Sequence, residues 1–169
     1  MSAAADRLVG NPHLTGLTVE QAKDLLHRSA RFSFSKGDVL LREGEDGQSM
    51  ILLDEGSVAV RRGDHVLATL EPGATIGEMA LLDPAPRSAT VVATTDGAAF
   101  EVSRVVLWEM LAEGNPAAVT ILQGLTATVC GRLGDVNRLV QEEVVKPRGN
   151  VFSRLWKSVS RAGRKEATA

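Results

Sequence analysis

Residues 76–93 contain side chains that could bind a small phosphodiester. Gly77 precedes a run of helix formers, so the backbone could approach a ligand closely while the free N–H groups of one helical turn point at an anion. Arg87 supplies a guanidinium that can donate to two phosphate oxygens, and Ser88 beside it offers a hydroxyl donor. A carboxylate repels phosphate, so we expect Glu78 to accept hydrogen bonds from a sugar hydroxyl.

This order of glycine, acid, arginine and small residue between apolar runs resembles the phosphate-binding cassette of cyclic nucleotide-binding domains. Such domains occur in protein kinase A regulatory subunits and in the catabolite activator protein family. The matching positions are Ile76, Gly77, Glu78, Met79, Ala80 and Leu81, followed by Arg87, Ser88 and Ala89. The resemblance implies that Glu78 binds the ribose 2′-hydroxyl and Arg87 the equatorial phosphate oxygen. It also implies that Ser88 and the amides near Met79 and Ala80 bind the remaining oxygens.

The residues that would contact the base are less well defined. Ala89 and Val91 could line an apolar floor, and the resemblance implies that a residue from about 132 to 137 reaches the base from a C-terminal helix. The phosphate and ribose contacts are common to cAMP and cGMP. In the family a threonine after the arginine indicates cGMP, so Ser88 favours cAMP.

Two other interpretations of this segment stay open. Glu78 and Arg87 could form a surface salt bridge at the ends of a loop, with residues 79–82 as an ordinary turn that faces the core. Alternatively, the chain could be a family member that keeps the fold and has lost the ligand. Such a loss usually removes the arginine or the acid, and this chain has both.

The elements that must position these side chains are mainly strands. From residue 32 to residue 102, short β-branched runs are separated by glycine turns such as Asp46-Gly47 and Pro72-Gly73. This spacing predicts an all-β sandwich or barrel, and eight strands suit a jelly roll. The same span resembles the β-roll of the family. We expect the strands near residues 32–35, 38–42, 49–53, 57–61, 65–69, 74–76, 89–94 and 98–102.

Helices are expected on both sides of the strands. Thr18 and Gln21 have capping-box spacing at the start of a short N-terminal helix. After the strands, Ser103 can cap a helix over about 104–113, and a proline at the first helical position begins another over about 116–145. The predicted fold class is mainly β with flanking α: an eight-stranded jelly-roll β-roll with a short N-terminal helix and C-terminal helices.

Composition favours one globular domain with extensions. The chain has 169 residues, of which 44% are hydrophobic and 24% charged, as in folded proteins. We expect an N-terminal extension (1–14), a cyclic nucleotide-binding domain (15–145, with C-terminal helices over about 104–145) and a basic amphipathic tail (146–169). No stretch approaches the roughly 18 apolar residues of a membrane span. The first residues lack the core of a signal peptide, so we expect a cytoplasmic protein.

An apolar stripe on the last predicted helix favours a homodimer through residues 116–145. In the family the corresponding helix lies over the pocket and often pairs with its twin. The alternative is that the stripe packs on its own β-roll, since three glycines weaken the helix by up to about 1 kcal/mol each. The stripe recurs at spacings of three or four residues and comprises Leu122, Leu125, Val129, Leu133, Val136, Val140 and Val144.

Charge is distributed unevenly along the chain. Residues 1–145 carry 12 basic and 20 acidic side chains and residues 146–169 carry 7 and 1, so the net charges are −8 and +6. The tail could bind an anionic membrane surface, an acidic partner or the acidic body of its own domain. The alternative is that its apolar residues pack on the β-roll and the remainder is a solvated end. Those apolar residues, at i, i+3, i+4 and i+7, are Phe152, Leu155, Trp156 and Val159.

The sequence contains no recognisable catalytic or metal-binding set. His13, His27 and His65 lack ligand spacing, so no metal is expected. No Ser/His/Asp or Cys/His arrangement is apparent, so no catalytic residue is assigned and we expect no enzyme activity. Cys130 lies in an apolar helical stretch, which predicts a buried, inert thiol. Only 24 residues follow the last predicted helix, too few for a helix-turn-helix, so we expect no sequence-specific DNA binding.

Two function classes follow. The first is a sensor that binds a cyclic nucleotide, cAMP rather than cGMP, and relays its occupancy to an unidentified effector protein through the C-terminal helices. No cofactor other than this ligand is expected. The second is a ligand-free interaction scaffold of the same fold, which could attach to a membrane through its basic tail.

Overall fold

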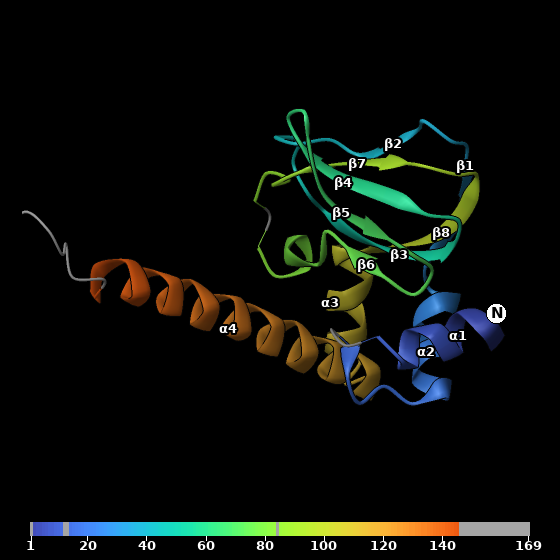
Figure 1. Cartoon of the computed structure of the whole chain (residues 1–169). Coiled ribbons are helices and arrows are strands. Elements are labelled where there is room, and N and C mark those ends of the chain that lie inside the picture. Colours follow the sequence, from blue (N-terminus) through green and yellow to red (C-terminus); the bar gives the residue numbers. More distant parts are fainter. Residues whose placement is uncertain (1, 12–13, 84, 146–169) are drawn as a thin grey trace, which may run out of the picture. The chain divides into compact units, whose positions relative to one another are not determined.

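The computed structural model describes residues 2–11, 14–83 and 85–145 (Figure 1). The chain divides into two compact units, Met1–Thr128 and Val129–Ala169. The first unit contains all the strands described below, and the second is helical over residues 129–145. The predicted amphipathic segment in residues 152–159 lies outside the described residues.

Eight strands of the described chain form two four-stranded antiparallel sheets, which confirms the predicted β-roll. All eight predicted strands occur, with ends that agree to within two residues. One sheet has the order β1-β8-β3-β6 and the other the order β2-β7-β4-β5. In chain order, the strands are β1 Ala30–Phe34, β2 Val39–Leu41, β3 Ser49–Glu55, β4 Val58–Arg62, β5 His65–Leu70, β6 Thr75–Ile76, β7 Thr90–Ala93 and β8 Gly97–Ser103.

Strand β3 separates two hydrophobic cores because its successive side chains point to opposite faces. Ile51 and Leu53 lie in the core inside the roll. Met50 and Leu52 lie in a second core, which includes residues of the helices. Burial on both faces explains why residues 49–54 are all buried and mostly apolar.

Three helices pack on the side of the roll formed by β3 and β8 (Figure 1). They are α1 (Ser2–Val9), α2 (Val19–His27) and α3 (Arg104–Ala112). The predicted capping box at α2 is confirmed, since Thr18 Oγ1 accepts from the Gln21 amide at 3.2 Å and Gln21 Oε1 accepts from the Thr18 amide at 2.9 Å. The cap at α3 is also confirmed, because Ser103 Oγ accepts from the Val106 amide at 3.2 Å.

Helix α1 is not among the elements that the sequence predicts. A helix of eight residues is marginal in isolation, and packing against the rest of the domain stabilises it. Asn11, which follows it, donates from Nδ2 to the Gly73 carbonyl at 2.6 Å. Its buried residues join the core shared with α2 and α3, and they are Ala4, Ala5 and Leu8.

Helix α4 spans Pro116–Val145, as predicted. In the first unit, Asn115 Oδ1 accepts from the Ala117 amide at 2.9 Å, and Leu125 is buried. In the second unit, Leu133 is 59% exposed. Cys130 is also exposed, so the predicted buried thiol is wrong. One residue turns an α-helix by about 100°, which places Cys130 away from the apolar stripe that passes through its neighbour.

Candidate functional site

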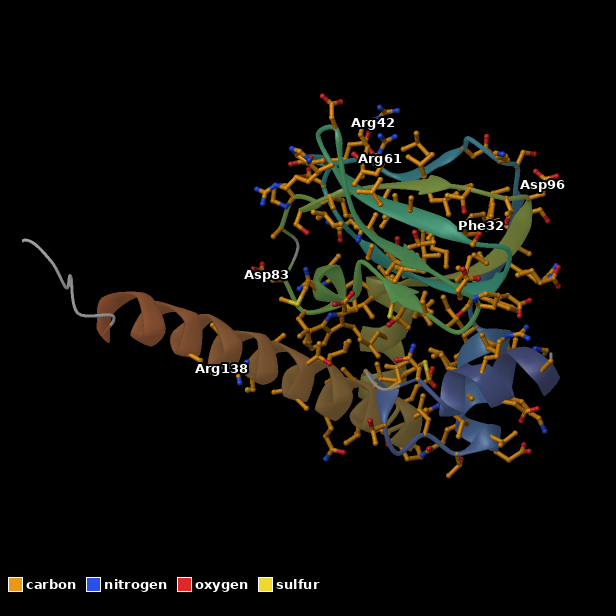
Figure 2. The ribbon with its side chains drawn as sticks, in the orientation of Figure 1. Phe32, Arg42, Arg61, Asp83, Asp96 and Arg138 are labelled. Carbon is orange, nitrogen blue, oxygen red and sulfur yellow. The ribbon has the colours of Figure 1, made fainter. Side chains whose placement is uncertain are left out.

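The predicted ligand site lies in the connection between β6 and β7. Gly77 follows β6 with a φ of 74°, in the left-handed region that other residues rarely adopt. It begins η2, a single 3-10 turn over Glu78–Leu81, where the sequence predicted one helical turn. The Ala80 amide donates to the Gly77 carbonyl at 3.1 Å, and the Asp83 amide donates to the Met79 carbonyl at 2.9 Å. Figure 2 shows Asp83 on the loop that follows this turn.

The side chains of η2 divide between the site and the core. Glu78 is only 6% exposed, whereas Met79 is 38% exposed. Ala80 is buried, and its amide is already used within the turn. Leu81 is fully buried in the core that contains helix residues, so the turn is anchored to the helical layer.

Arg87 lies beside the turn and is held by neutral acceptors. Its Nη1 donates to the Gly77 carbonyl at 3.1 Å. Its Nη2 donates to the Ser49 carbonyl at 2.7 Å and approaches Ser49 Oγ at 3.4 Å. In the described part of the chain, no carboxylate forms an ion pair with Arg87. The side chain therefore has its geometry fixed while its charge has no direct counterion among these residues.

The charge of Arg87 is partly removed from water. Burial lowers the pKa of the guanidinium, because the charged form loses solvation, while the carboxylates of Glu101 and Glu78 act in the opposite direction. A guanidinium nevertheless stays protonated in proteins. The alternative of a surface salt bridge between Glu78 and Arg87 does not fit this site, since Glu78 is buried and the two side chains form no ion pair.

The other predicted residues lie on and before β7. Ser88 is exposed next to Arg87, and Ala89 is half-buried. Val91 is 2% exposed and belongs to the apolar core inside the roll. Most of the side chains from 132 to 137, where a contact to the base was expected, lie outside the described residues.

Ser49 is a site residue that the sequence does not reveal. It is separated from Arg87 by 38 positions, and the sheet topology brings the two together. Its only sequence signal is the Asp46-Gly47 turn shortly before strand β3, which predicts a loop but no contact to the cassette. Ser49 is 8% exposed, so its carbonyl and hydroxyl accept from Arg87 in a largely buried place.

Metal ligands do not gather in the part of the chain that the structure describes. No group there of three or more His, Cys, Asp or Glu side chains could hold a metal ion. His13 lies outside the described residues.

None of the helices within the described residues is both long enough and apolar enough to cross a membrane.

Comparisons with known proteins match the same region. Residues 31–113 match the family model described as the cyclic nucleotide-binding domain. The chain is 36% identical over 85 residues to a cAMP-dependent protein kinase regulatory subunit of Hypocrea atroviridis, a match that covers 50% of this chain and 18% of that protein. It is 38% identical over 81 residues to a cGMP-dependent protein kinase of Toxoplasma gondii, covering 47% of this chain and 8% of the kinase. The chain thus spans less than a fifth of these relatives.

A solved structure extends the likeness beyond the strands. The N-terminal domain of a transcriptional regulator from Streptomyces coelicolor A3(2) superposes with a TM-score of 0.68 and 29% sequence identity. The match covers 79% of this chain and 94% of that domain. The flanking helices are therefore part of the shared fold.

Proposed function

Residues 31–113 belong to the cyclic nucleotide-binding domain family, and we propose that the chain is a sensor that binds a cyclic nucleotide, with cAMP favoured over cGMP. The observation that carries this proposal is the environment of Arg87. Its guanidinium is half-buried and bonded to the neutral acceptors of Gly77 and Ser49. It adjoins a glycine turn and a buried acid, Glu78.

A cyclic phosphodiester would place an anion in direct contact with Arg87, which none of the described carboxylates does. Phosphate oxygens would replace neutral carbonyls as acceptors for Arg87, so that both donor and acceptor are ionised, and a guanidinium can bind two phosphate oxygens at once. Ser88 is exposed and could donate from its hydroxyl. Glu78, held in a largely buried position, would accept from the ribose 2′-hydroxyl.

Fewer observations support the preference for cAMP over cGMP. Ser88 follows the arginine where a threonine would favour cGMP, and this supports cAMP. The relatives named above include both a cAMP-dependent and a cGMP-dependent kinase protein. Direct comparison of the two nucleotides is therefore part of the test.

Two connections could relay occupancy to the C-terminal helices. Leu81 of η2 shares a core with Leu107 of α3 and Ile121 of α4. The loop that holds Arg87 is also bonded to α3, because the Arg104 amide donates to the Gln48 carbonyl at 2.8 Å. A ligand that binds one arrangement of these elements better than another shifts their populations, which an effector protein could detect.

Calorimetric titration with cAMP and with cGMP tests the proposal. We expect saturable binding by the wild-type chain and by Arg62→Ala, a control arginine whose side chain is 71% exposed. We expect Arg87→Ala to lose binding by at least about thirtyfold, since loss of one partner of a buried charged contact costs about 2–5 kcal/mol. No heat from either nucleotide, with the protein folded and free of co-purified ligand, would reject the sensor.

A ligand-free scaffold is the second candidate, and exposed apolar residues on α3 favour it. Val105 is 64% and Trp108 48% exposed. The Arg104 guanidinium lies 5.9 Å from the Trp108 ring centre, a combination common in protein interfaces. A partner interaction that Trp108→Ala disrupts and Arg87→Ala leaves unchanged would support the scaffold over the sensor.

The proposal extends to assembly and to the tail. Leu133 is 59% exposed on α4, which supports a homodimer through residues 116–145. Sedimentation equilibrium of the wild-type chain and Leu133→Asp tests this, with a monomeric wild type as the contrary result. Contact of residues 146–169 with an anionic surface is tested by sedimentation with vesicles of phosphatidylserine and phosphatidylcholine against phosphatidylcholine alone.

A further inference from the structure

Residues 44–49, from the β2–β3 connection to the first residue of β3, contact both the backbone and the guanidinium of Arg87. The Arg87 amide donates to the Glu45 carbonyl at 2.8 Å, and the Gly44 amide donates to the Arg87 carbonyl at 2.9 Å. The guanidinium reaches the Ser49 carbonyl at 2.7 Å. The ligand-binding geometry of the cassette is therefore set partly by a loop that lies outside the cassette motif.

Glycine is favoured at two positions of this connection for different structural reasons. Gly44 has a φ of 84°, and a Cβ there would meet no atom within 4 Å, so glycine is favoured by conformation. Gly47 is not among the residues with positive φ. A Cβ at Gly47 would lie 3.1 Å from both Cζ and Nε of Arg87 and 2.9 Å from Cβ of Ala80. Carbon atoms make favourable contact at about 3.5–4.0 Å, so Gly47 is favoured by space.

Gly77, which belongs to the cassette, also packs closely against the guanidinium of Arg87. A Cβ at Gly77 would overlap Nη1 of Arg87 and lie 3.2 Å from its Cζ. The guanidinium thus packs against two backbone segments that have no side chain at the point of contact. One of these, Gly77, belongs to the cassette motif, whereas the other is 40 positions away from Arg87 in the sequence.

We propose that Gly47 is a positioning residue of the nucleotide site. The absence of a side chain at residue 47 lets the guanidinium occupy the position in which it donates to Gly77 and Ser49. The effect of Gly47 on nucleotide affinity rests on the proposed function, whereas its effect on the position of Arg87 does not.

The geometry also indicates what a methyl group at residue 47 would do. Alanine can adopt the backbone conformation of Gly47, and the guanidinium is the end of a long side chain that can rotate away. The contact with Arg87 is therefore relieved by moving the guanidinium, and the contact with Cβ of Ala80 by a small shift of the connection relative to η2. Loss of one hydrogen bond to a charged group lowers affinity by about tenfold to a hundredfold.

The test compares Gly47→Ala with Gly10→Ala in the full chain. Gly10 is a matched control, since it also lacks a positive φ and a Cβ there would lie 3.6 Å from the Arg7 carbonyl, an ordinary contact. We measure the Nε–H resonance of Arg87 in nucleotide-free protein, assigned by its absence in Arg87→Lys, together with the affinities for cAMP and cGMP. We expect Gly47→Ala to shift this resonance and to lower affinity about tenfold to a hundredfold, while Gly10→Ala changes neither.

An unchanged Arg87 resonance in folded Gly47→Ala would overturn the proposal. Binding of neither nucleotide by the wild type would reject the proposed function, and the resonance would still decide the position of Arg87. If Gly47→Ala fails to fold, the same substitution is made with Ala80→Gly, which removes the contact at 2.9 Å and keeps the one with Arg87. The comparison is then with Ala80→Gly alone, and the same shift is expected.

Discussion

Arginines in two regions of the first unit, residues 1–128, are held in opposite ways. Arg7 and Arg31 both pair with Asp54 on β3, a carboxylate that is 6% exposed, and Arg31 also pairs with Glu55 at 3.2 Å. Arg87 is held by carbonyls and a hydroxyl instead. Ion pairs stabilise the first region by themselves, whereas the second has a cation in position for an anion from outside.

Because of this difference, we expect the paired arginines to contribute mainly to stability and Arg87 mainly to ligand binding. Removing a partner from a compensated buried pair leaves a charge unpaired, so the cost falls on the folded state. Removing a cation that pairs with no carboxylate among the described residues costs the folded state less, because the desolvation penalty that disappears with it offsets part of the lost bonds to neutral acceptors. We therefore expect substitutions in the two regions to affect different measurements.

The largest effect is expected for Arg87→Ala. Affinity for the cyclic nucleotide should fall at least about thirtyfold. The free energy of unfolding without nucleotide should fall by only about 1 kcal/mol, because the lost bonds to Gly77 and Ser49 are partly offset by the desolvation penalty that disappears with the charge. Urea unfolding and calorimetry measure the two quantities. A loss of stability above about 2 kcal/mol would place Arg87 in the same class as Arg7 and contradict the comparison.

The reverse pattern is expected for Asp54→Asn. It should lower the free energy of unfolding by about 2 kcal/mol, less than for a fully buried pair because Arg7 and Arg31 are 34% and 48% exposed. Nucleotide affinity should stay within about twofold. Glu55→Gln is the control, since this carboxylate is 64% exposed and should contribute less than about 1 kcal/mol. Reduced affinity with unchanged stability would count against a structural role for Asp54.

Glu78→Gln sharpens the comparison within the site. Wild-type protein should bind cAMP about tenfold more tightly than 2′-deoxy-cAMP, because a carboxylate accepts strongly from the 2′-hydroxyl. The variant should bind both nucleotides with similar, lower affinity. Competition titration measures the ratio, and a wild-type protein that does not distinguish the two nucleotides would exclude Glu78 from ribose binding.

The smallest effect concerns a fourth arginine, Arg28, at the C-terminal end of α2. Arg28 pairs with Asp24 and Glu113, and Asn115 Nδ2 donates to Asp24 at 2.6 Å. The bond from Asn115, followed by Arg28, lowers the pKa of Asp24. The Asp24 carboxylate therefore contributes to the free energy of unfolding above its ordinary pKa of about 4. This contribution is lost as the pH falls through the lowered pKa of the folded state.

Asp24→Asn should remove this acid-dependent part of the stability and little else. Because Asp24 is 40% exposed, we expect less than about 1 kcal/mol at neutral pH. Urea unfolding between pH 2 and 7 measures it. A variant that loses as much stability on acidification as the wild type would show that Asp24 contributes nothing to it.

Local patterns account for much of what the sequence predicts correctly. The capping box at Thr18 and Gln21 and the cap at Ser103 depend on contacts within three residues. Alternating strands between glycine turns predicted all eight strands, since one pattern specifies both the strand and its turn. Helix α1 escaped prediction because its stability depends on packing against α2 and β3 rather than on a pattern of its own.

The sequence alone determined the fold class, the starts of α2, α3 and α4 and the cassette that contains Gly77, Glu78 and Arg87, because each is encoded by neighbouring residues. Only the tertiary structure decided which groups surround Arg87. Gly47 comes from the connection between β2 and β3, Ser49 is the first residue of β3, and Glu101 comes from β8. The sheet topology brings these residues next to Arg87. Local sequence spacing does not predict this, because antiparallel pairing joins positions that are dozens of residues apart.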